Sequence, residues 1–136
     1  MGYELREHTA DVAVEATGET LGDTFAAVAD GMAAAMCETV PGGGQRHDVS
    51  VTAEGCEALL FDYLDRLIYE RDVRSVLPVD NAATVAETGG GWRADGSFRG
   101  VPLGAVTARD LKAVTYSEMD ISERDSGFHA YVVFDV

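Results

Sequence analysis

The sequence predicts an α+β fold over residues 1–136, with a mostly antiparallel sheet and two amphipathic helices packed on one face of it. Three observations lead to this prediction. Segments of alternating hydrophobicity outnumber segments with helical periodicity, and the two kinds do not alternate regularly as they would in a parallel sheet. The chain has no internal repeat or long linker, and its length is usual for one domain.

The N-terminal part predicts two short strands followed by a helix. Residues 3–8 alternate weakly in hydrophobicity and residues 11–16 alternate clearly, with the sequence HTAD between the two segments. Thr20 and Asp23 have the spacing of a capping box. The apolar residues that follow recur at the helical period. They predict a helix with one buried stripe that ends near Cys37.

The middle of the chain predicts a strand over residues 47–53 and then a second helix, whose apolar face lies within residues 59–68. On its polar side, Asp62 and Arg66 are an acid and a base one helical turn apart. Residues 73–87 predict a further strand, interrupted by a proline.

The C-terminal part predicts three more strands. The Gly89–Gly91 run is a turn signal that leads into a strand containing Trp92 and Phe98. Residues 111–121 and 128–136 predict two closing strands joined by a polar turn. We expect the two helices to cover one face of the resulting sheet.

The charge of the chain is unusual for its size. Twenty-four acidic residues stand against ten basic ones, which gives a formal net charge of −14 and a pI near 4.3. Nine of the ten basic residues are Arg, and Lys112 is the one lysine. We interpret this surface as an adaptation to the salty cytosol of a halophilic archaeon, or as an acidic face for a basic protein partner. Without a basic stripe, direct binding of free nucleic acid is not expected.

The chain is expected to be cytoplasmic and not bound to a membrane. No apolar run reaches the ~20 residues that a membrane span needs, and the first residues do not have the pattern of a signal peptide. Cys37 and Cys56 form no CxxC pair. Two buried thiols are the favoured interpretation, a disulfide is the alternative, and a zinc site is not expected.

Three short segments are candidates for a functional site. His8, Thr9 and Asp11 lie just before a strand, although turn chemistry alone explains such residues. Asp135 and the carboxylate of Val136 lie at the end of an apolar strand and would suit Ca²⁺, Mg²⁺ or Mn²⁺ if a third carboxylate joined them. The ordinary alternative is a solvated chain end. Lys112 is notable because the composition otherwise avoids lysine, which favours a position that needs a compact ammonium group. The alternative is a lysine retained by chance.

No catalytic signature of an enzyme is present. The chain has no GxSxG sequence, no Walker-type phosphate loop and no HExxH sequence. His47 and His129 lack the spacing of metal ligands, so we interpret them as exposed or hydrogen-bonded histidines. The sequence therefore favours a protein that is not itself an enzyme.

The candidate segments, taken together, resemble the archease family. The sequences HTADV, LLFDYLDRLIY, GVPL, LKAVTY and the C-terminal VVFDV occur in the family's order and span nearly the whole chain. The resemblance implies an archease-like fold and a function as an activator of an RtcB-type tRNA-splicing RNA ligase, promoting its guanylylation and its multiple turnover. It also implies an alternative function, that of a chaperone-like modulator of a tRNA methyltransferase.

The resemblance further implies which residues carry the function. The ligase-activating residues would be Asp11, Lys112 and Asp135. A divalent metal ion, Ca²⁺ in the family, would be bound by Asp11, Asp135 and Val136. The acidic surface, the shortage of lysine and the segment from Trp92 to Phe98, which resembles an insertion, depart from the family's pattern but leave these motifs intact.

The excess of carboxylates predicts that the stability of the fold depends on salt. Repulsion between the carboxylates opposes compaction at low ionic strength, and screening by salt relieves it. We expect the thermal midpoint, followed by circular dichroism, to rise substantially between low and molar KCl. A midpoint that stays constant over this range would contradict the halophilic interpretation.

Overall fold

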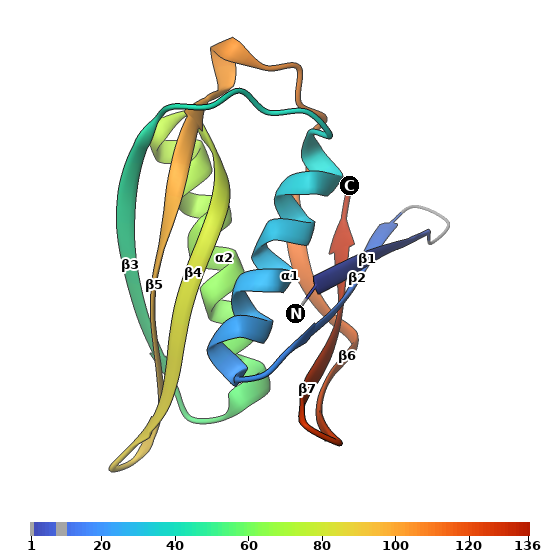
Figure 1. Ribbon diagram of the computed structural model, residues 1–136, viewed down its shortest axis with the longest axis vertical. Coiled ribbons are helices and arrows are strands. Elements are labelled where there is room, and N and C mark those ends of the chain that lie inside the picture. Colours follow the sequence, from blue (N-terminus) through green and yellow to red (C-terminus); the bar gives the residue numbers. More distant parts are fainter. Residues whose placement is uncertain (1, 8–10) are drawn as a thin grey trace.

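The computed structural model describes residues 2–7 and 11–136 of the chain (Figure 1). His8 and Thr9 of the HTAD segment lie outside the described residues, whereas Asp11 lies within them. The elements follow one another along the chain as β1 (Gly2–Glu7), β2 (Asp11–Gly18), α1 (Leu21–Met36), β3 (Gln45–Ala53), α2 (Cys56–Arg74), β4 (Val76–Thr88), β5 (Gly91–Pro102), a 3₁₀ turn (Leu103–Ala105), β6 (Ala113–Arg124) and β7 (Gly127–Asp135).

The strands of the described chain form two antiparallel sheets. One has the order β1-β2-β7-β6 and the other the order β3-β5-β4. The predicted α+β class, with antiparallel pairing and two helices, is confirmed. The prediction of one sheet is wrong in that the strands divide into two sheets, and the helices lie between them (Figure 1).

The helices occupy this position because both carry apolar residues on more than one side. Helix α1 packs against β1, β2 and β7 of one sheet and against β4 of the other. Eleven of its sixteen residues are buried, including Phe25 and Met32, so the prediction of a single buried stripe was too narrow. Helix α2 likewise contacts β6 on one side and β3, β4 and β5 on the other. Each sheet therefore has one face covered by the helix pair.

The ends of α1 lie close to their predicted positions. The amide of Asp23 donates a hydrogen bond to Thr20 Oγ1 at 3.0 Å, so Thr20 is the N-cap that the sequence predicted. Cys37 caps the other end. Cys37 and Cys56 are free thiols, and both are partly exposed rather than buried as predicted. Partial burial, followed by the charge of Glu57, raises the pKa of Cys56 to about 11.

The boundary between α2 and β4 differs from the prediction. Residues 73 and 74 continue the helix, which ends where Ser75 adopts a left-handed conformation with φ of 54°. On the polar side of α2, Arg66 pairs with Glu70 at 3.0 Å, one turn later, instead of making the predicted pair with Asp62. Pro78 is accommodated because β4 is an edge strand of its sheet.

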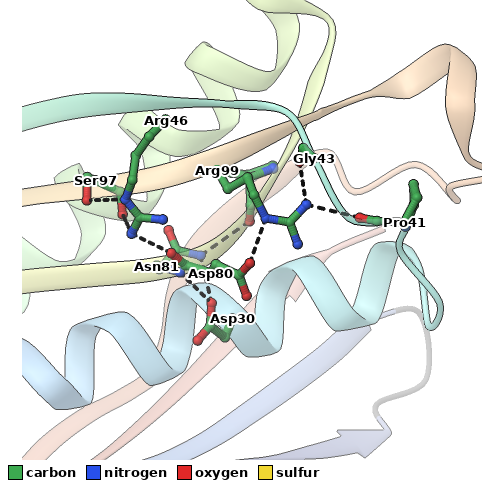
Figure 2. Close-up of polar contacts among 9 residues, drawn as sticks. Asp30, Pro41, Gly43, Arg46, Asp80, Asn81, Ser97 and Arg99 are labelled. Carbon is green, nitrogen blue, oxygen red and sulfur yellow. Dashed lines mark hydrogen bonds and ion pairs between the residues drawn. The ribbon is translucent and has the colours of Figure 1, made fainter.

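A network of polar side chains joins α1 to a bulge in β4 (Figure 2). Asp30 of α1 accepts hydrogen bonds from the amide and the side chain of Asn81, both at 2.9 Å. Burial raises the pKa of Asp30, and the bonds from Asn81 oppose that rise. At the same bulge Arg99 binds the Asp80 carboxylate at 2.7 Å and the carbonyl of Pro41 at 3.0 Å. The network thereby ties the loop after α1 to the three-stranded sheet.

No helix among the described residues is long and apolar enough to cross a membrane.

Candidate functional site

The second and last strands of the described chain bring two predicted site residues together. Strands β2 and β7 pair in antiparallel orientation at the centre of their sheet, and Asp11 lies directly opposite Asp135. Residues opposite each other in such a pair project on the same side of the sheet, with Cβ atoms about 5 Å apart. The two carboxylates are therefore neighbours, although 124 positions separate them along the chain.

The backbone of Lys112, the third predicted residue, lies next to Asp135 on the other side of β7. Ala113, the first residue of β6, also pairs with Asp135. The amide of Lys112 donates a hydrogen bond to the carbonyl of Asp135 at 2.8 Å. The Lys112 side chain is exposed. Asp135 therefore stands between the strand that carries Asp11 and the segment that carries Lys112.

The carboxylates lie on the face of the sheet that turns away from the helices. Val14 of β2 and Phe134 of β7 belong to the hydrophobic core between the helices and this sheet. Because side chains alternate along a strand, Asp11 and Asp135 project on the opposite face. Asp11 is partly exposed and Asp135 is exposed, so both carboxylates are accessible from solution.

The donor set of this pair suits a hard divalent cation. Two carboxylates opposite each other repel in a sheet, and a bound cation would remove that repulsion. Within residues 2–7 and 11–136, no three His, Cys, Asp or Glu side chains form a metal-binding group. Val136, which follows Asp135 directly and is partly exposed, is the further ligand that the sequence resemblance named.

A buried arginine fixes the segment that leads to Lys112. Arg71 of α2 donates from Nη1 to the carbonyl of Leu111 at 2.7 Å, and the same nitrogen lies 3.3 Å from the sulfur of Met36. Its Nε binds Asp72 at 3.0 Å. Arg109 is held by its amide, which donates to the carbonyl of Met36 at 2.8 Å. Residues 109–112 are thus anchored to both helices and to β7 without belonging to a helix or strand.

Sequence reasoning did not identify Arg71. Its burial could have been predicted, because Arg71 continues the helical spacing of the buried residues Leu64, Leu67 and Ile68. A charged residue at such a position has to find a partner inside the fold. The partner, a backbone carbonyl 40 positions later, is not visible in the sequence.

A groove lies beside the start of β2. An open groove of about 830 Å³ runs between the first two strands, the end of α1 and residues 107–109, with Val12, Cys37 and Arg109 among its lining residues. The two histidines within the described residues lie in structural contacts. His129 is buried with Nε2 3.5 Å from Glu15, and the ring of His47 lies 5.4 Å from that of Phe98.

The chain is similar to known proteins over its whole described length. The model of the Archease protein family matches residues 3–136. A protein archease from Archaeoglobus fulgidus is 32% identical, and the match covers 100% of both chains. A protein archease from Thermococcus gammatolerans is 30% identical over 92% of this chain and 91% of its own.

Two solved structures share the fold. The solution structure of protein 1598 from Methanobacterium thermoautotrophicum has a TM-score of 0.86 at 28% identity, covering 99% of each chain. A crystal structure from Thermotoga maritima, described as an archease and possible chaperone, has a TM-score of 0.61. It is 21% identical and covers 98% of this chain and 96% of its own, so this likeness concerns the fold alone.

The contacts of Arg71 predict that its substitution lowers the free energy of unfolding much more than substitution of Arg74 in the same helix. Arg71→Met keeps an aliphatic stem but leaves the Leu111 carbonyl without its donor, which should lower the free energy of unfolding by about 1.5–3 kcal/mol. Arg74→Met leaves the buried Glu70 carboxylate bound to Arg66 and removes an exposed arginine, so it should lower the free energy of unfolding by only about 0–1 kcal/mol. Chemical denaturation followed by circular dichroism measures both. Faster hydrogen exchange at the Lys112 amide should accompany only the first change, and equal losses in the two variants would contradict the anchoring role.

Proposed function

The chain belongs to the archease family, and on this premise we propose that it activates an RtcB-type tRNA-splicing RNA ligase. In this proposal it promotes the guanylylation and the multiple turnover of the ligase and is not itself an enzyme. The acting residues are Asp11, Lys112 and Asp135, and Asp11, Asp135 and Val136 bind a divalent cation.

One observation supports the proposal most directly. The register of β2, β7 and β6 places Asp11, Asp135 and the backbone of Lys112 within one end of a single sheet. These residues come from three distant parts of the sequence, and the hydrophobic core has no need for them to be charged. An exposed arrangement of two acids and the single lysine is more typical of a site that acts on another molecule.

A site of this composition could assist guanylylation by supplying charge and by positioning groups. The reaction requires the phosphates of GTP, metal ions and a nucleophile to be held in place while negative charge is redistributed. When bound, a divalent cation would supply positive charge to phosphate oxygens. Asp11 and Asp135 would hold it at the end of the sheet, and Lys112 would offer an ammonium group beside it. Carboxylate oxygens suit Ca²⁺, which the family resemblance favours, as well as Mg²⁺ and Mn²⁺.

Charge also argues for a protein partner over free RNA. A net charge of −14 repels phosphates, so the protein would reach RNA only through a partner that binds it. A second candidate function, which the family resemblance implies, is that of a chaperone-like modulator of a tRNA methyltransferase. The two are distinguished by whether the purified chain accelerates guanylylation of the ligase.

The role of Lys112 is tested by a charge removal with a matched control. Lys112→Ala should reduce the stimulated single-turnover rate of ligase guanylylation on the order of 10²-fold, the cost of losing one well-placed electrostatic group. Its fold should be unaffected, because an exposed substitution usually changes stability by less than ~0.5 kcal/mol. Arg124→Ala removes one positive charge at the far end of β6 and should stimulate the ligase like the wild type.

Lys112→Arg adds a second test of the same role. A planar guanidinium does not replace a compact ammonium at a crowded site, so this variant should recover only part of the rate. If Lys112→Ala stimulates guanylylation as well as the wild-type protein does, the lysine has no role in activation.

A further inference from the structure

The solvent-facing side of α2 carries apolar side chains that the fold does not cover. Of the described residues, the large hydrophobic ones that are exposed are Tyr3, Leu5, Tyr69, Val73 and Tyr116. Tyr69 and Val73 lie one turn apart on α2, with 57% and 62% of their surface exposed. Exposed apolar residues gathered on one face are typical of an interaction surface.

The aromatic character of this side extends toward the β6 strand. The ring of Phe61, two turns before Tyr69, stacks on the exposed ring of Tyr116 in β6, with centroids 4.1 Å apart and planes 8° apart. Tyrosines and other aromatic residues often supply the largest contributions at protein interfaces.

Acidic residues alternate with these apolar ones along the same side of the helix. The resulting surface, called the α2 face below, consists of Phe61, Asp62, Asp65, Tyr69, Asp72 and Val73. Its three acids are exposed. The spacing of three and four residues places all six side chains on one side of a helix.

The basic residues of α2 are held by partners within the fold. Arg66 and Arg74 both bind the carboxylate of Glu70, at 3.0 and 2.6 Å, beside the α2 face. Arg71 is buried and bound to the Leu111 carbonyl and to Asp72. The α2 face is therefore apolar and, through Asp62 and Asp65, negative.

The position of the α2 face relates it to the candidate site. Arg71, at the C-terminal end of α2, contacts Leu111, and the next residue is Lys112. Arg71 itself is buried, but Asp72 of the α2 face is exposed and binds its Nε at 3.0 Å. Asp72 lines a shared hollow with Arg109 and Asp110, so a partner that contacted residues 109–112 would meet this end of the α2 face in the same encounter.

We propose that the α2 face is the docking surface for a basic, partly apolar patch on the RNA ligase, an assignment that rests on the proposed function. The charge of the face selects this partner. A second copy of the chain would bring acids against acids, whereas lysines or arginines around an apolar centre complement both features. Docking at the α2 face sets affinity, and the site at Asp11, Lys112 and Asp135 acts on the docked ligase.

A titration of the protein against a fixed amount of the ligase from the same organism separates these two roles. The readouts are the half-saturating concentration of the protein and the guanylylation rate at saturation. Tyr69→Gln with Val73→Gln should raise the half-saturating concentration about tenfold or more and leave the saturated rate unchanged. Glutamine keeps the helix propensity, and both positions are exposed, so the fold should persist.

A second pair of variants tests the charge of the face. Asp62→Lys with Asp65→Lys should also raise the half-saturating concentration and should weaken its dependence on KCl, because fewer opposite charges meet at the interface. Asp48→Lys with Glu87→Lys makes the same change in net charge at exposed positions of the other sheet and should titrate like the wild type.

The possible failures of the two proposals are distinguishable. A wild-type protein that neither binds nor stimulates the ligase would overturn the proposed function and the docking assignment with it. Normal stimulation by wild type, together with an unchanged half-saturating concentration in both α2 variants, would overturn the docking assignment alone. Self-association of the wild-type protein that is abolished by Tyr69→Gln with Val73→Gln would also overturn it, because the face would then bind a second copy.

Discussion

The antiparallel pairing of β2 with β7 is the constraint on which the rest of the candidate site depends. The hydrophobic core sets this register, since Val14, Val132 and Phe134 all have to face the helices. A slip of one residue would turn every side chain of a strand to the other face. With the register fixed by the core, Asp11 and Asp135 have to lie opposite each other on the face that carries no helix. The core thus determines where the acids meet, although the acids contribute nothing to it.

Other parts of the fold position Lys112 and the segment before it next to Asp135. Strand β6 places Lys112 beside Asp135, and the buried Arg71 fixes the chain just before it. Burying a guanidinium costs free energy unless its donors are satisfied. The buried guanidinium of Arg71 satisfies its donors partly on the carbonyl of Leu111 and thereby fixes the conformation of residues 109–112. The helices therefore contribute to the site through a single anchoring side chain as well as through the core.

Much of the fold follows from sequence periodicity. What periodicity cannot predict depends on contacts between residues that are distant in the sequence. Alternation and helical spacing identify the strands and both helices, because each depends on neighbouring residues. The division into two sheets does not follow, since which strands pair depends on contacts between distant segments. The end of α2 was misplaced because Val73 is apolar and β-branched, as in a strand, yet lies in the last turn of the helix. At the site, motif resemblance named Asp11, Lys112 and Asp135, whereas Arg71 and the α2 face required the structure.

The central claim is that Asp11 and Asp135 form one cation site because the β2–β7 register places them together. Calorimetric titration with Ca²⁺ and with Mn²⁺ tests it most directly, on the wild type, Asp11→Ala, Asp135→Ala and the double variant, with the exposed Asp48→Ala as control. We expect each single change to weaken binding nearly as much as both together, because the two carboxylates act as a unit. Asp48→Ala should bind like the wild type. Equal affinity in all five proteins would contradict the shared site.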